Sequence, residues 1–428
     1  MSVRSLERVL LYLTIIAGFI GSGFLAIEVG SIHLFPYRFF LPLLWVLFAQ
    51  SVLLNQGRVN VSRIKVKAYL CFLALWLIYA IFSLAWAASK IDAIRDIIFL
   101  SMAVSVIFFT IYYVNELGYL KQFYYLWLVM SAVLVLIGIW EITTGRHLAV
   151  SVLAQTLDPR VQFMPTAVFR NPNDYATYLA LSIPFVLVWI RYSSGVFRRL
   201  LGVILLIASL YVLVATTSRA NYLAVFVGSV FWFLFMLKFK GKFRVVTLVV
   251  SSVLALLITF PNEVQSVFTT VSIHLDIWGD YLSQVASSSI NVRLNLIKNA
   301  LTFLVNSLGF GVGAGNVRYY MAEFPVYATY ERVNVHNWWI EVLTNYGLFI
   351  FVAYVIFFIH LILEIYRNYR KLTNTTEKMI GEGLLMALVC FFLASISPSS
   401  VMAFRPQWML FAFALSFLNY SRVKGAVS

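Results

Sequence analysis

Charged residues are scarce in this sequence. Only 11% of its 428 residues are Asp, Glu, Lys or Arg, whereas 62% are hydrophobic, and the mean hydropathy is strongly positive. So few polar groups could not cover the surface of a water-soluble protein of this length. A soluble globular protein is therefore excluded, and most of the surface is expected to face lipid.

Cysteine and clustered acidic residues are also scarce. Cys71 and Cys390 are the only cysteines, and both lie inside apolar runs, which indicates neither a disulfide framework nor a metal site. No group of acidic residues has the spacing of metal ligands. We expect no bound metal and no cofactor.

Long apolar runs make up most of the chain. Each is close to the ~20 residues that a helix needs to cross ~30 Å of hydrocarbon. Backbone polar groups in lipid must be satisfied within the protein, and unbroken runs of this length achieve that as helices. We therefore expect an all-α, polytopic protein with about 12 transmembrane helices, forming one membrane domain over residues 1–428. The predicted spans are 9–27, 37–54, 68–87, 96–114, 119–140, 175–190, 200–216, 221–237, 245–260, 337–362, 380–396 and 404–419.

Basic residues gather in the short loops on one side of these spans. With a cytoplasmic N-terminus, that side holds 20 of the 32 basic residues and only 5 of the 17 acidic ones. This is the positive-inside pattern, so both termini are predicted to be cytoplasmic. It accounts for the net charge of +15 without nucleic acid as a partner. The first span has no following cleavage site of small residues, so it is expected to be retained.

A long loop is predicted on the outer side at residues 261–336, and we expect it to fold there as a subdomain. Within it, Leu294, Ile297, Leu301 and Leu304 recur at helical spacing before Gly309. This predicts an amphipathic helix that lies on the membrane or caps the bundle. The glycine-rich run that follows has no preceding strand, so it is interpreted as a turn that permits close backbone packing and not as a nucleotide loop.

Four arginines on the outer side do not fit the charge asymmetry. A cation near lipid either snorkels to the interface or faces a polar cavity. Several arginines that converge from different helices would form an anion pocket suited to phosphate. The four arginines on the outer side are Arg170, Arg219, Arg293 and Arg405.

His336 is placed at the outer water boundary, because two tryptophans follow it at the start of a span. A histidine there could accept a proton near neutral pH, where a polar substrate could approach. A structural role at the helix start is the alternative.

Four local patterns together resemble the bacterial O-antigen ligase and polysaccharide polymerase superfamily of membrane glycosyltransferases. Their order matches that family, as does the long outer loop. They are FRNPNDYA at residues 169–176, TSRA at 217–220, the glycine-rich run at 309–316, and His336-Asn337 with Glu341 and Gly347.

The resemblance implies a GT-C type enzyme that takes a glycan from a polyprenyl-diphosphate carrier such as undecaprenyl diphosphate. The glycan would pass to a glycan or glycolipid acceptor hydroxyl on the outer face of the cytoplasmic membrane, with inversion and without a metal. By the same resemblance, His336 would be the general base, and Arg219 and Arg293 would bind the diphosphate. Candidates for shaping the donor pocket are Arg170, Asn171, Asn173, Asp174 and Arg405.

Two other functions remain open. A polymerase of the same superfamily needs the same base and arginines, so the motifs do not distinguish it from a ligase. A transporter or flippase of lipid-linked sugars would place ionisable residues at mid-membrane. Here the unusual polar residues lie near the outer ends of the spans, which favours chemistry at one face.

Overall fold

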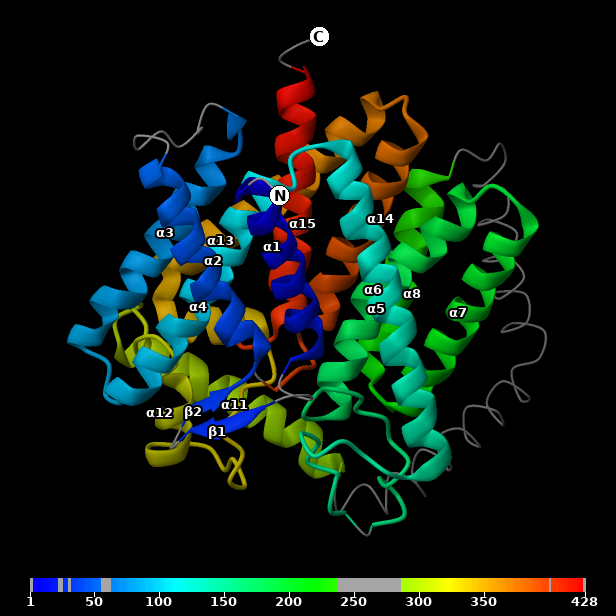
Figure 1. Cartoon of the computed structure of the whole chain (residues 1–428). Helices are drawn as coiled ribbons and strands as arrows, with labels where there is room; N and C mark the ends of the chain where they lie inside the picture. Colours follow the sequence, from blue (N-terminus) through cyan, green and yellow to red (C-terminus); the bar gives the residue numbers. More distant parts are fainter. Residues whose placement is uncertain are drawn as a thin grey trace.

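The chain folds as a bundle of helices with one short β-hairpin (Figure 1). The computed structural model describes residues 3–21, 26–29, 32–54, 63–156, 158–237, 286–399 and 402–425. The elements are α1 (Val3–Ile20), β1 (Ile27–Val29), β2 (Ile32–Leu34), α2 (Pro36–Leu54), α3 (Lys67–Phe82) with a 3-10 turn (Ser83–Ala85), α4 (Lys90–Tyr113), α5 (Leu117–Thr144), α6 (Pro172–Tyr192), α7 (Val196–Ala215), α8 (Arg219–Phe231) with a π turn (Trp232–Met236), α11 (Ala286–Asn306), α12 (Val317–Glu323), α13 (Trp338–Lys371), α14 (Thr375–Ala394) and α15 (Arg405–Gly425).

Every predicted span other than 245–260 overlaps one of these helices. That span, and residues 261–285 of the predicted outer loop, lie outside the described residues. Within the described residues, eight helices are long and apolar enough to cross a membrane, so the chain is a helical membrane protein. The first span differs most from its prediction. It begins at Val3 and ends at Ile20, because Gly21 takes a left-handed conformation (φ 65°) that stops the helix.

Helix α15 lies in the middle of the bundle, where every residue from Pro406 to Asn419 is buried. It packs against α4, while the equally buried α14 packs against α6 and α8. Because other helices shield them from lipid, α14 and α15 can carry polar side chains that a lipid-facing helix could not. The outer helices show the opposite pattern. On α7, for example, Val196 and Ile207 are exposed, as expected where the surface meets acyl chains.

Both chain ends lie at the same end of the bundle, and α11, α12 and the hairpin lie at the opposite end (Figure 1). We call this opposite end the loop end. It also holds the connection from α5 to α6, residues 145–171. Glu141 at the end of α5 anchors this connection, because its carboxylate accepts the N–H groups of Thr166 and Ala167 and lies 3.1 Å from His147 Nδ1.

Helix α11 caps the loop end, as the sequence predicted, but it buries a different stripe of side chains. Val292, Leu296, Ala300 and Phe303 form a small core with α12 and the segment before α13. The predicted stripe is less buried: Leu294 and Leu301 are exposed, at 50% and 41%. Both faces of this helix are apolar, so periodicity alone could not show which face packs on protein. The exposed stripe is the one available to a membrane surface.

The glycine-rich run at residues 309–315 pairs with the backbone of α13. The N–H of Val312 donates to the carbonyl of Thr344 at 2.9 Å, and the N–H of Gly313 donates to Asn345 at 3.0 Å. The close backbone packing that was predicted for this run is therefore confirmed.

Gly347 makes this pairing possible by interrupting α13. Its dihedral angles, φ 76° and ψ 178°, are accessible essentially to glycine alone. A Cβ at Gly347 would stand 2.5 Å from the backbone of Phe310, and one at Gly311 would stand 2.5 Å from the N of Gly347. Two main chains therefore touch at this point, with no space for a side chain.

Replacing Gly347 by alanine should destabilise the protein strongly. The strained backbone alone costs about 1–3 kcal/mol, and the contact with Phe310 adds to this cost. We expect a clear fall in the melting temperature of the purified protein in detergent. Gly118→Ala is the matched control, because nothing lies within 4 Å of a Cβ there. Equal melting of the two variants would contradict the proposed packing.

Candidate functional site

The turn between α14 and α15 (residues 395–399, the α14–α15 turn) connects the elements of the loop end. The N–H of Trp338, at the start of α13, donates to the carbonyl of Ser395 at 3.1 Å. Thr177 of α6 donates to the carbonyl of Ala394, just before the turn, at 3.3 Å. The turn is thus tied to two helices that carry predicted site residues.

The start of α6 holds the far side of this turn. Asn171 is the N-cap of α6 and accepts the N–H of Asp174 at 3.0 Å. The carboxylate of Asp174 accepts the backbone N–H of Ser399 at 3.0 Å, and the amide of Asn171 donates to the Ser399 hydroxyl at 2.9 Å. These predicted donor-pocket residues therefore position the turn.

A second set of hydrogen bonds joins the turn to the start of α8. Asn173 Oδ1 accepts from the hydroxyls of Ser218 (2.9 Å) and Ser397 (3.1 Å), and these two hydroxyls lie 2.9 Å apart. Ser218 is the N-cap of α8, and Arg219 is its first helical residue. The position of Arg219 is thus fixed relative to the turn through its neighbour Ser218.

His336 lies against the backbone of the same turn. The pKa of His336 is lowered to about 4, chiefly by burial and in addition by the positive charges of Arg293 and Arg332, while hydrogen bonding to the backbone of Ser397 and Pro398 partly opposes this shift. The imidazole is therefore neutral at physiological pH. Its Nδ1 is buried and forms no hydrogen bond with any residue that the structure describes.

Arg293, on α11, is the charged residue with the strongest effect on His336. Its side chain is half-buried, and burial lowers its pKa, as does the positive charge of Arg332. Arg293 and Arg332 thus both lie close enough to His336 for their charges to act on it. A half-buried and an exposed arginine beside a neutral base are suited to bind an anion next to a proton acceptor.

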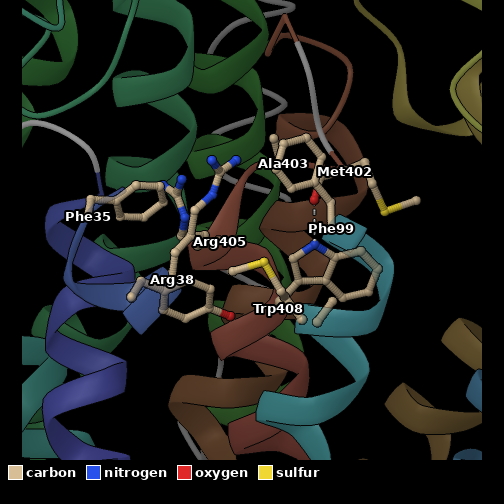
Figure 2. A pocket seen from close by; sticks show the side chains of 10 residues that line it. Phe35, Arg38, Phe99, Met402, Ala403, Arg405 and Trp408 are labelled. Atoms are coloured by element: carbon tan, nitrogen blue, oxygen red, sulfur yellow. Dashed lines mark hydrogen bonds between the residues drawn. The ribbon is translucent and has the colours of Figure 1, made fainter. Parts of the chain in front are cut away.

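The other predicted arginines occupy separate positions. Arg170 and Arg219 are exposed at the starts of α6 and α8. Arg219 is not among the described groups whose charge acts on His336. Arg405, at the start of α15, lines a different pocket together with Arg38 (Figure 2). Within the described ranges, no three His, Cys, Asp or Glu side chains gather closely enough to hold a metal ion.

Left-handed backbone conformations occur in or near the segments that contain the predicted site residues. His336 itself has φ 53°, Thr217 before Arg219 has φ 56°, and Ala167 before Arg170 has φ 47°. Such conformations are unfavourable for residues with a Cβ, and they cluster at sites where the surroundings hold a functional geometry. His336 and Thr217 belong to motifs that were identified from the sequence, and Ala167 lies two positions before another.

Sequence reasoning missed the serines of the α14–α15 turn. Ser397 and Ser399 make the hydrogen bonds described above, but in the sequence they stand in a short SISPSS segment between two apolar runs. Serine-rich connections between helices are common, so their composition gave no signal. Their location opposite Asn173 and Asp174 depends on how α14 and α6 pack.

Fold and site together define a helical membrane protein with a neutral histidine and several arginines at one end. Residues 203–355 match the protein family described as O-antigen ligase. The teichuronic acid biosynthesis protein TuaE of Bacillus subtilis (strain 168) is 33% identical over 415 residues, which cover 96% of this chain and 84% of that protein. The chain therefore belongs to the O-antigen ligase-like superfamily.

Removing the carboxylate of Asp174 should loosen the α14–α15 turn. In Asp174→Ala the N–H of Ser399 loses its acceptor, and an unsatisfied buried group costs about 1–3 kcal/mol. We expect a lower melting temperature and faster hydrogen exchange at residues 395–399. Asp158→Ala is the control, because among the described residues this half-buried carboxylate forms its ion pair with nearby Arg160, two positions away. Unchanged exchange in the Asp174 variant would show that the turn does not depend on this carboxylate.

Proposed function

We propose that the chain transfers a glycan from a polyprenyl-diphosphate carrier to an acceptor hydroxyl. The reaction would take place at the loop end, which we infer to face the outside of a bacterial cytoplasmic membrane. The observation that carries this proposal is the neutral His336 beside Arg293. A base and an anion-binding cation next to each other are what this transfer requires.

In the proposed reaction the acceptor oxygen attacks the anomeric carbon of the carrier-linked glycan. A new carbon–oxygen bond forms as the bond to the diphosphate breaks, and a single displacement of this kind inverts the anomeric carbon. The diphosphate leaves with the electron pair of the broken bond. His336 takes the proton of the acceptor hydroxyl, and its low pKa keeps it neutral and ready to do so.

Arginines would stabilise the negative charge that develops on the leaving diphosphate. Arg293 would act next to His336, and Arg219 would act from the start of α8, where the positive end of the helix dipole also favours an anion. Preorganised charges of this kind typically contribute about 10²–10³ in rate. The proposal therefore assigns to arginine the role that a divalent metal has in other enzymes, and it expects activity in the presence of a chelator.

The acceptor decides whether such an enzyme is a ligase or a polymerase. A ligase moves the glycan to a lipid or protein acceptor, whereas a polymerase moves it to another carrier-linked unit. The name of the Bacillus relative places that protein in teichuronic acid biosynthesis, which favours a cell-envelope polysaccharide as the product here and gives no support to lipopolysaccharide. Transport of a lipid-linked sugar is the more distant alternative.

Replacing His336 by alanine should lower kcat by about 10²–10⁴, the usual contribution of a general base. The assay supplies a polyprenyl-diphosphate-linked oligosaccharide, candidate acceptors and a chelator, and product size distinguishes ligation from polymerisation. His360→Ala is the matched control, because this exposed histidine lies far along α13 and bonds to Tyr69. Equal rates for wild type and the His336 variant would exclude His336 as the base. Absence of product with every acceptor would favour transport.

The pH dependence should report the low pKa of His336. A base must be neutral to accept a proton, so kcat/KM should fall only as the pH approaches about 4, and not near the ~6.5 of an ordinary histidine. In Arg293→Gln one cause of the depressed pKa is lost, so this fall should move to higher pH. Arg367→Gln, an exposed residue paired with Glu364, should leave the profile unchanged. A profile that Arg293→Gln does not move would contradict the assignment.

A further inference from the structure

The connection between α12 and α13 is held on α11 by two asparagines. Asn299 is fully buried. Its side-chain oxygen accepts the N–H groups of Val326 at 2.9 Å and Tyr327 at 2.8 Å, and its amide donates to the carbonyl of Tyr327 at 2.8 Å. Asn295, one turn earlier on α11, donates to the carbonyl of Ala328 at 3.1 Å. The backbone of this connection is therefore fixed to α11 by side chains of that helix.

The segment of residues 326–332, which we call the clamped segment, ends in a strained turn. The carbonyl of Thr329 accepts the N–H of Arg332 at 3.1 Å, and Tyr330 and Glu331 between them have φ of 50° and 63°. These are the φ values of a type I′ turn, which usually has Asn, Asp or Gly at both positions. Tyr330 is 70% exposed, so burial of its side chain does not offset the strain. Such a conformation persists only where the surroundings hold it.

The contacts with α11 show in which direction the clamped segment runs. As residue numbers rise along the segment, its partners on α11 change from Asn299 to Asn295. The segment therefore runs antiparallel to α11, which brings its last residue, Arg332, toward Arg293. The charges agree with this register, because burial and then the positive charge of Arg332 lower the pKa of Arg293. Helix α11 thus positions two cations, one of its own and one through the clamped segment.

Arg332 is available to a ligand. It is exposed, and no carboxylate among the described residues forms an ion pair with Arg293 or Arg332. After burial and Arg293, the charge of Arg332 also lowers the pKa of His336, whereas Arg219 is not among the groups that act on this histidine. Two guanidinium groups at one place match the oxygens of a phosphate or diphosphate.

We propose that Arg332 is a further diphosphate-binding residue of the candidate site and that Asn299 is its positioning residue. Arg293 and Arg332 contact the diphosphate of the donor together, next to His336. This role in catalysis rests on the proposed function. Binding of a lipid diphosphate and its dependence on Asn299 can be measured without sugar transfer.

Diphosphate binding is measured on the full chain in detergent. Farnesyl diphosphate is the probe, because it carries the diphosphate and no sugar. Native mass spectrometry should show that wild type binds it and that Arg293→Gln and Arg332→Gln each weaken binding about tenfold or more, through loss of charge-assisted hydrogen bonds. Arg367→Gln, an exposed arginine near the end of α13 paired with Glu364, is the matched control and should bind normally.

The result for Arg332 is separate from the result for the proposed function. Binding that Arg293→Gln weakens and Arg332→Gln does not would overturn the role of Arg332 and leave the proposed function intact. Absence of binding to wild type would overturn both. Binding that both variants weaken, in a protein that transfers no sugar to any acceptor, would count against the proposed function alone.

The positioning role predicts that Asn299 acts through Arg332. Asn299→Ala should speed hydrogen exchange at residues 326–332 and weaken binding of farnesyl diphosphate as Arg332→Gln does. Adding Arg332→Gln to Asn299→Ala should weaken binding no further, because both changes remove the same contact. Asn368→Ala, whose amide donates to the carbonyl of Glu364, is the control. A double variant in which the two losses multiply would overturn the positioning role.

A pH profile separates positioning from a general loss of stability. Burial remains the main cause of the lowered pKa of His336, but Arg332→Gln removes one further cause. The fall of kcat/KM at acid pH should therefore move to higher pH, by less than in Arg293→Gln, because Arg293 acts more strongly. Asn299→Ala should move it in the same direction. A lower melting temperature with an unmoved profile would show that Asn299 is only structural.

Chemical modification keeps the test independent of variants that fail to fold. Phenylglyoxal should react with the exposed Arg332 of the wild-type protein, as detected by peptide mass spectrometry. Farnesyl diphosphate should protect Arg332 from this reaction, and farnesol, which lacks the diphosphate, should not. Equal reaction of Arg332 with and without farnesyl diphosphate would overturn the proposal.

Discussion

Asp174 accepts the backbone N–H of Ser399 across the space between the start of α6 and the α14–α15 turn. Together with Asn171 and Asn173, this carboxylate holds the α14–α15 turn in place by hydrogen bonds from side chains. His336 lies against the backbone of this turn. The geometry of the candidate site therefore depends on side chains at the start of α6 that bond to the α14–α15 turn.

At the loop end, burial in a low-dielectric medium affects which ionisable side chains are charged. Burial makes protonation of His336 unfavourable and lowers its pKa, and the positive charges of Arg293 and Arg332 add to this effect. In the proposed reaction the same cations would attract the anionic donor. A bound diphosphate would then oppose the effect of Arg293 and raise the proton affinity of His336 as the reaction begins.

Span positions and the order of the motifs could be predicted from the sequence, because both depend on local composition. Apolar runs must be helical in lipid, and His336, Arg219 and Asp174 lie in short motifs that can be identified from the sequence. The features that could not be predicted depend on contacts between residues far apart in the sequence. Ser397 became important only through its contact with Asn173. On α11, two apolar faces competed, and the contacts with α12 selected the face that contains Leu296.

The order of the chain has a consequence for biogenesis. Asn171 and Ser399, which bond to each other, are 228 positions apart, and the α14–α15 turn joins the last two described helices. During synthesis, α6 and α8 enter the membrane long before their partner in this contact exists. These hydrogen bonds cannot form until α14 and α15 are inserted. A nascent chain that ends before α14 therefore lacks the contacts that hold the start of α6 and the start of α8 together at the loop end.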